Sequence, residues 1–286
     1  MSLYRQMNLE VSLGRRTNTA GFPGHRQEKK RLSNTDNGGC GLTFRLTTVG
    51  KRHALVMERT HFTHMPTPTA VITKATSISG VTIPESKLAR EATELVRDTE
   101  SPLLFNHSSR VYYFASLAGK RLGLKFDPEL LYIAAMFHDM GLTPEYSSKA
   151  DRFEVDGANA ARAFLRRRKI SQEEIDTVWT AIALHTTPGI PQYMHPVVAL
   201  LTNGVEMDVL GIAYSDFSSD DRDAIVAAYP RTGHFKEDII NAFYEGIKHK
   251  PETTFGNVKA DVLADKDPRF QRMNFCSVIR GSQWES

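Results

Sequence analysis

Cysteine is almost absent from this chain of 286 residues, in which only Cys40 and Cys276 occur. Two cysteines cannot build a disulfide scaffold or a thiolate metal site, so we expect a reducing compartment, the cytoplasm. Long apolar runs are missing as well. The longest, residues 130–137, is far shorter than the ~20 residues that a membrane-spanning helix needs. These absences exclude a disulfide-rich secreted domain and predict no membrane span.

Several catalytic motifs are missing too. The sequence contains no P-loop, no G-x-G-x-x-G and no G-x-S-x-G. Each of these motifs places backbone N–H groups or a nucleophile for a particular chemistry. Their absence argues against a kinase, a dinucleotide-dependent dehydrogenase and a serine hydrolase.

A strong excess of one charge is missing, since 36 Lys and Arg oppose 33 Asp and Glu. Residues 1–65 hold 11 basic and 4 acidic residues, whereas the remainder holds 25 basic and 29 acidic residues. Because the bulk of the chain is mildly acidic, the overall basic balance is no evidence for nucleic-acid binding. We expect a small neutral molecule as partner, and neither nucleic acid nor a membrane. Self-association into a homo-oligomer is compatible with the sequence.

The first 80 residues show no sustained hydrophobic period and contain a cluster of turn-forming residues at 34–39. We expect residues 1–80 to form an irregular, disordered extension, and residues 81–286 to form one folded domain. The start of the chain is Arg-rich and acid-poor, which is also typical of a transit peptide. We prefer a disordered arm or an upstream start codon, which leaves open whether residues 1–65 belong to the mature protein.

From residue 86 onward the pattern is helical. Ser101-Pro102 and Asp127-Pro128 each place a capping residue before a proline, and Ser171 with Glu174 forms a capping box. These signals and the apolar periodicity predict an all-α bundle of seven or eight helices. The expected helices are 86–99, 102–122, 128–139, 153–168, 171–185, 196–211, 218–229 and 234–249.

Polar residues interrupt three apolar stripes. His107 lies in the inward stripe of the helix 102–122, His138-Asp139 ends an almost wholly apolar helix, and Asp208 continues another stripe. A buried carboxylate at a helix C-terminus is opposed by desolvation and by the helix dipole. Two neutral imidazoles and two carboxylates carry two negative charges, which one divalent cation would neutralise. Nitrogen and oxygen ligands of this kind suit Zn²⁺, Fe²⁺ or Mn²⁺. The alternative is that His107 is an ordinary core histidine and that His138-Asp139 is a hydrogen-bonded helix end. Four such residues on three apolar helices favour the metal site over this alternative.

The order His107, His138-Asp139, Asp208 resembles the H…HD…D signature of the HD-domain superfamily of metal-dependent hydrolases. The surrounding segments are similar to the cyanamide hydratase branch of that superfamily. They are FNHSSRVYYFA (105–115), FHDMGLT (137–143), RFEVDGANAARAFL (152–165), AIALHTTPGI (181–190), GVEMDVLG (204–211) and KPETTFGNVKADVL (250–263). The similarity covers roughly residues 84–284, and many relatives with these segments have no established substrate.

The resemblance implies an HD-domain bundle with a metal-binding core at 102–211 and a C-terminal helical cap at 212–286. It also implies one zinc ion held by His107, His138, Asp139 and Asp208, and the hydration of cyanamide to urea. A bound metal lowers the pKa of water towards ~7–9 and so supplies hydroxide. That hydroxide would attack the nitrile carbon.

Further site residues are suggested by the resemblance together with their positions. His185 ends the helix 171–185 on its inward face, and mostly because of the resemblance we assign it as the acid that protonates the nitrile nitrogen. The plain alternative for His185 is a histidine that bonds a last-turn carbonyl. Asp139 is expected to be catalytic as well as a metal ligand. Asn106, Thr186 and Thr187 are candidates for substrate binding.

Two other functions remain open at this stage. One is an HD-type phosphohydrolase of a nucleotide or another small phosphate, which would need several Arg or Lys groups near the metal. Near the motifs only Arg110, Lys149 and Arg152 are available. The other is a metal-stabilised binding module without turnover, which a metal without solvent access would favour.

Overall fold

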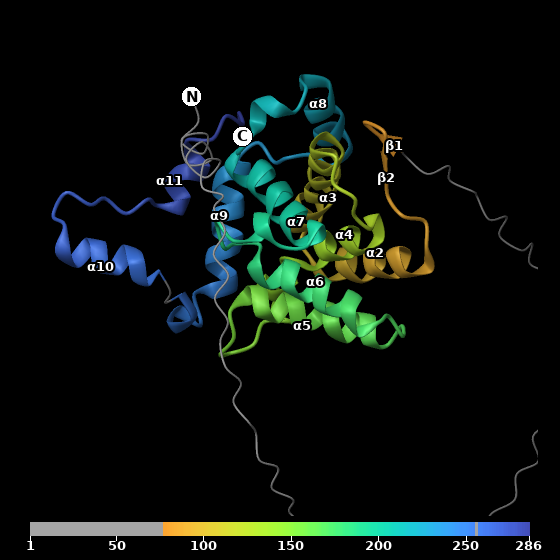
Figure 1. The fold of residues 1–286 in the computed structure, drawn as a ribbon, viewed down its shortest axis with the longest axis horizontal. Helices are drawn as coiled ribbons and strands as arrows, with labels where there is room; N and C mark the ends of the chain where they lie inside the picture. The colour runs from red at the N-terminus through yellow and green to blue at the C-terminus, as the bar shows by residue number, and fades with distance from the viewer. Residues whose placement is uncertain (1–76, 255–256) are drawn as a thin grey trace, which may run out of the picture. The chain divides into compact units, whose positions relative to one another are not determined.

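A computed structural model describes residues 77–254 and 257–286, and over these residues the chain is all-α, as predicted (Figure 1). The one sheet in this part of the chain is a short antiparallel hairpin of β1 (Ser77–Ile78) and β2 (Val81–Thr82). The expectation of an irregular extension falls almost wholly on residues 1–76, outside the described residues.

All eight predicted helices are present, with ends that differ by a few residues. They are α2 (Lys87–Thr99), α3 (Pro102–Leu122), α4 (Pro128–Phe137), α5 (Phe153–Arg166), α6 (Gln172–Leu184), α7 (Pro196–Val205), α8 (Ser219–Ala228) and α9 (Phe235–Ile247). Two further helices, α10 (Val258–Lys266) and α11 (Phe275–Arg280), follow near the C-terminus and were not predicted.

The predicted caps start the helices where the sequence places them. The Ser101 hydroxyl accepts the Leu104 N–H at the start of α3, and the Asp127 carboxylate caps α4. Ser171 and Glu174 form the full capping box of α6. Each cap satisfies backbone N–H groups that have no partner inside the helix, so short local signals fix these starts.

Helix α4 lies at the centre of the bundle. Residues 130–137 are all buried, and α2, α3, α5, α6 and α7 all pack against this helix. The apolar composition of α4 explains this position, because a helix that is apolar all round must be covered on every side. The residues that follow α4, His138 and Asp139, are therefore delivered to the interior.

Helices α3 and α7 approach closely at Gly204. A Cβ atom there would lie 2.5 Å from the Val111 carbonyl oxygen and 3.0 Å from the Ala115 Cβ. Only glycine allows this separation of the two helices. The contact fixes α7 against the helix that carries His107.

Helix α7 does not end as a regular α-helix. It continues into a π-helical turn, Glu206–Leu210, which ends at Gly211 with a φ of 66°. Such turns are rare and occur often at functional sites. Asp208 lies in this turn.

None of the helices in the described part of the chain is long and apolar enough to cross a membrane.

Candidate metal centre

Two helices bring three metal-ligating side chains together inside the bundle. His107 comes from the middle of α3, and His138 and Asp139 follow the last residue of α4. All three residues are 0% exposed. One ligand atom of each lies within 4.8 Å of the others. The structure thus unites three of the four predicted ligands.

The distances within this cluster fit a shared cation. The two Nε2 atoms of His107 and His138 are 3.1 Å apart, and they lie 3.6 Å and 3.4 Å from the Asp139 Oδ2 atom. Ligand atoms at ~2.0–2.2 Å from a metal lie ~3–4 Å from one another. The cluster therefore has the dimensions of a ligand set.

Hydrogen bonds at Nδ1 fix the tautomers of both imidazoles. His107 Nδ1 lies 2.7 Å from Asp208 Oδ2, and His138 Nδ1 lies 2.7 Å from the Ala135 carbonyl oxygen. Since a carbonyl and a carboxylate only accept hydrogen bonds, Nδ1 carries the proton in each ring and Nε2 presents its lone pair. Burial lowers the pKa of His138 to about 3, which keeps that ring neutral.

Asp139 has no partner of its own. Both carboxylate oxygens are buried, and neither has a hydrogen-bond donor among the described residues. Two Nε2 lone pairs and a bare carboxylate thus face each other without a proton between them, an arrangement that costs free energy unless a cation is present. The residues therefore fit a divalent metal ion with nitrogen and oxygen ligands.

His185 lies directly beside this cluster. It follows the last residue of α6, donates from Nδ1 to the Ile182 carbonyl oxygen at 2.7 Å, and packs edge-on against His138. Its Nε2 atom is buried, has no hydrogen-bond partner among the described residues and lies 3.8 Å from Asp139 Oδ1. His185 therefore bonds a last-turn carbonyl, as in the plain alternative, and its Nε2 atom also faces the candidate centre. Its role as the catalytic acid stays a prediction.

Asp208 is not brought into the cluster. Its carboxylate lies at Nδ1 of His107, on the other side of the ring from the Nε2 atom that faces His138 and Asp139. Arg110 binds it through Nε and Nη2 at 2.8 Å and 2.9 Å, and Arg231 binds it through Nη1 at 3.0 Å. In this arrangement Asp208 binds His107, Arg110 and Arg231 instead of facing the cluster. Its role as a metal ligand stays a prediction.

These arginines also replace the metal as the source of positive charge for Asp208. Burial raises the pKa of that carboxyl, but the charges of Arg110 and Arg231, together with the hydrogen bonds from His107 and Arg110, outweigh burial and hold the pKa well below its usual range, so that Asp208 stays ionised. In the sequence, no basic residue lies within a helical turn of Asp208, because Arg110 lies on another helix and Arg231 in a loop. Only the fold brings them together.

The predicted substrate-binding residues lie near the cluster but have other partners. Asn106 donates from Nδ2 to the Pro230 carbonyl oxygen at 3.2 Å. The Thr186 hydroxyl donates to the buried Glu154 carboxylate, and Thr187 is half-buried. Their role in substrate binding remains a prediction.

Sequence reasoning missed one buried acid. Glu100, between α2 and α3, is 6% exposed, accepts from the Ser108 hydroxyl at 3.3 Å, and has no partner at Oε1 among the described residues. Burial, and then the Asp139 carboxylate, raise its pKa well above the usual range. Its sequence neighbours give no periodic signal for burial, so its burial is seen only in the folded structure.

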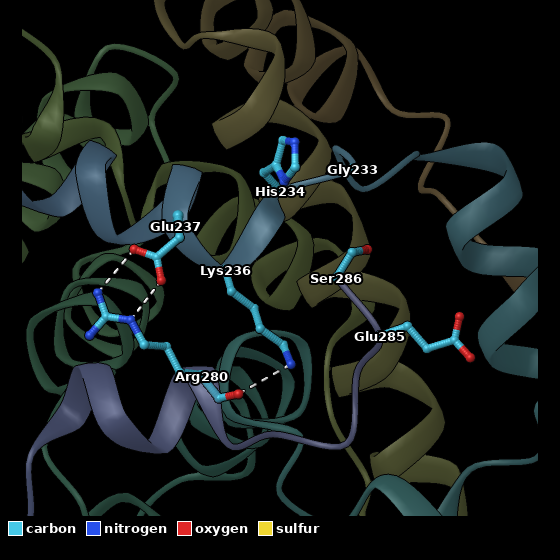
Figure 2. A pocket seen from close by; sticks show the side chains of 7 residues that line it. All are labelled: Gly233, His234, Lys236, Glu237, Arg280, Glu285 and Ser286. Atoms are coloured by element: carbon cyan, nitrogen blue, oxygen red, sulfur yellow. Dashed lines mark hydrogen bonds and ion pairs between the residues drawn. The ribbon is translucent and has the colours of Figure 1, made fainter.

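An open pocket of about 220 Å³ lies beside α9, and Figure 2 shows the side chains that line it. Its Arg280 donates two hydrogen bonds to Glu237, and its Lys236 contacts the carbonyl oxygens of Arg280 and Ser282. These two cations are already partnered. The pocket includes none of the cluster residues, which lie in the interior.

Comparison with protein-family models matches residues 104–222 to the HD domain. The matched stretch contains His107, His138, Asp139 and Asp208 and stops before Arg231. It supports the HD superfamily for this chain. Domains of this kind are generally metal-dependent hydrolases, so the match supports an enzyme in general terms. Comparison with curated proteins gives no match.

Proposed function

We propose that this chain is a metal-dependent hydratase of a small neutral substrate, with the hydration of cyanamide to urea as the leading candidate. His107, His138 and Asp139 would hold one divalent transition metal, with zinc expected first. When bound, such a metal would polarise water and supply hydroxide at neutral pH. The sequence resemblance supports the substrate, and the three-residue cluster supports the metal.

The observation that carries the choice of a neutral substrate is the state of the nearby cations. Arg110 and Arg231 are both committed to Asp208, and Arg152 to Glu154. A phosphate substrate needs cations that can reach its oxygens. These three arginines instead neutralise the protein's own carboxylates.

His185 would move the proton in this reaction. Its Nδ1–H is engaged by Ile182, so Nε2 can accept a proton from water and then release it to the nitrile nitrogen. Water adds to the nitrile carbon, the nitrogen gains the proton, and the resulting isourea tautomerises to urea. Asp139, 3.8 Å from Nε2, would stabilise the imidazolium in between.

Metal analysis of the purified protein tests the centre, together with urea release from cyanamide and a generic phosphatase assay. We expect about one equivalent of metal per chain, and its loss in His138→Ala and Asp139→Ala, because each removes a ligand from a three-residue set. Full metal occupancy in the double variant would exclude this site.

A phosphohydrolase remains the second candidate, because the HD match covers the centre. Phosphate release without urea formation would favour it. The burial of all three ligands keeps a third candidate, a metal-stabilised binding module. A metal-loaded protein that is inactive in both assays would favour that module.

A further inference from the structure

We propose that Asp208 acts as a positioning residue for His107 and does not bind the metal. The inference rests on the proposed metal centre. Three further residues would help to position His107 without binding the metal. Arg110 and Arg231 hold the Asp208 carboxylate, and Trp284 holds Arg231.

The hydrogen bonds to Asp208 leave no room for a metal bond. Oδ1 accepts from Arg110 Nε at 2.8 Å and from Arg231 Nη1 at 3.0 Å. Oδ2 accepts from Arg110 Nη2 at 2.9 Å and from His107 Nδ1 at 2.7 Å. A carboxylate offers about four lone-pair positions, and all four are occupied here. Asp139, by contrast, accepts no hydrogen bond at either carboxylate oxygen in the part of the chain that the structure describes.

The direction of the His107 ring leads to the same assignment. Its Nε2 atom faces the cluster, whereas Asp208 lies at Nδ1 on the opposite side of the ring. A carboxylate that accepts from the Nδ1–H of a ligating histidine fixes the ring's orientation and makes Nε2 more basic. Asp208 therefore stands where such a partner belongs.

Arg231 is in turn held by aromatic rings. Its guanidinium lies 3.7 Å from the Phe235 ring centre and 4.5 Å from that of Trp284. Trp284 also donates from Nε1 to the Met207 carbonyl oxygen at 2.9 Å, in the π-helical turn that carries Asp208. Trp284 thus supports both members of the Arg231–Asp208 pair.

The variant Arg231→Gln distinguishes Asp208 as a positioning residue from Asp208 as a metal ligand. The two roles predict opposite changes in Zn²⁺ affinity. If Asp208 positions His107, loss of Arg231 loosens the carboxylate, and we expect Zn²⁺ affinity to fall by ~10–100-fold. If Asp208 is a ligand, Arg231 competes with the metal, and the variant would bind Zn²⁺ as tightly as the wild type or more tightly. Affinity is measured by competition with a chelator.

The matched control is Asp156→Asn. Asp156 forms another buried ion pair, with Lys250 Nζ at 2.6 Å, and among the described residues neither side chain hydrogen-bonds to His107, His138 or Asp139. We expect this variant to lower the melting temperature without changing Zn²⁺ affinity. An equal loss of affinity in the control would attribute the Arg231 effect to general destabilisation and would overturn the inference.

Two spectroscopic measurements complete the test. Bound Co²⁺ should keep its absorption spectrum in Asp208→Asn and lose or change it in Asp139→Asn, since the spectrum reports the ligands. In the wild-type protein, the hydrogen-bonded Nδ1 proton of His107 should persist in the NMR spectrum after Zn²⁺ is added, which requires no variant to fold.

Two outcomes would overturn the inference in different ways. A changed Co²⁺ spectrum in Asp208→Asn, or loss of the Nδ1 proton on metal addition, would make Asp208 a ligand and leave the centre intact. A wild-type protein that binds neither Zn²⁺ nor Co²⁺ would overturn the centre itself, and this inference with it.

Discussion

His138 and His185 share one local arrangement, in which a ring that follows a helix donates from Nδ1 to a carbonyl three residues earlier. The helix end thus fixes the tautomer without any distant partner, and both Nε2 atoms point inward. His107, in the middle of α3, has no free carbonyl in reach and uses Asp208 instead. The tautomers of His138 and His185 are therefore fixed by nearby carbonyl groups. The tautomer of His107 alone among the three depends on a residue far away in the sequence.

Replacement of His185 by alanine tests its assignment as the proton carrier. A positioned acid or base contributes ~10²–10⁴-fold in rate, so we expect kcat for cyanamide to fall by that factor while metal content stays unchanged. Steady-state kinetics and metal analysis of the same preparation measure both. A change below ~5-fold, about 1 kcal/mol of barrier, would leave His185 only its role at the helix end. Loss of metal would make it a ligand.

Glu100→Gln tests the cost of a buried acid in the metal-free protein. Burial raises the pKa of Glu100 in the folded state, so the unfolded chain ionises first as the pH rises above about 4.5, and folding becomes less favourable. The variant lacks this penalty. We expect a higher melting temperature than wild type at pH 7–8 and no difference at pH 4. An equal or lower melting temperature at pH 7–8 would contradict the raised pKa of this buried acid.

The sequence revealed those site residues whose surroundings in the chain are apolar. His107 and His138-Asp139 stand out because polar side chains interrupt a hydrophobic stripe. Arg231 could not be found in this way, since it lies in a turn and its partner Asp208 is 23 residues away. Hydrophobic periodicity reports which side of a helix is buried, but not which charged groups meet there.

At the scale of elements, the sequence predicted the helices that start with a cap or a proline. Ser101, Asp127 and Ser171 mark their starts because a side-chain acceptor there replaces a missing backbone partner. Helix α10 escaped prediction because its residues are mostly exposed and show no apolar stripe. The π-helical turn Glu206–Leu210 also has no such local signal, and it appears only in the packed structure.

Gly204→Ala tests the close approach of α3 and α7. The added Cβ would lie 2.5 Å from the Val111 carbonyl oxygen, a backbone atom that cannot turn away. We expect a loss of stability of about 1–3 kcal/mol, as for other overpacked cores, and a melting temperature lower by several degrees. Gly123→Ala serves as the control, because a Cβ there has nothing within 4 Å, although its φ of 65° adds some strain. If the two variants were equally stable, the helix contact would not be tight.

At the scale of the whole molecule, distant parts of the chain are joined by buried ion pairs as well as by apolar packing. Lys250, after α9, is fully buried and pairs with Asp156 in α5, 94 residues earlier. Burial of one charge without the other would cost several kcal/mol. The segment around Lys250 is thus tied to α5 by a buried ion pair, and the predicted cap at 212–286 stays a prediction.

Removal of residues 1–65 tests the predicted extension. The sequence of this stretch offers no periodic apolar face, so its loss should remove little buried surface. We expect the shortened chain to keep its melting temperature within about 2 °C and its metal content and activity unchanged. Differential scanning calorimetry of both chains measures the first. A large fall in melting temperature would show that the folded domain needs this stretch.

The π-helical turn at Glu206–Leu210 gives this part of the chain an unusual sensitivity to length. Its hydrogen bonds span one residue more than those of an α-helix, so it behaves as an α-helix with a single insertion. Each residue of an α-helix turns the chain by ~100°, and a one-residue deletion there would rotate Asp208 away from its present direction. The length of this turn therefore decides whether the Asp208 carboxylate meets His107 Nδ1, and a change of one residue in that length would break their contact.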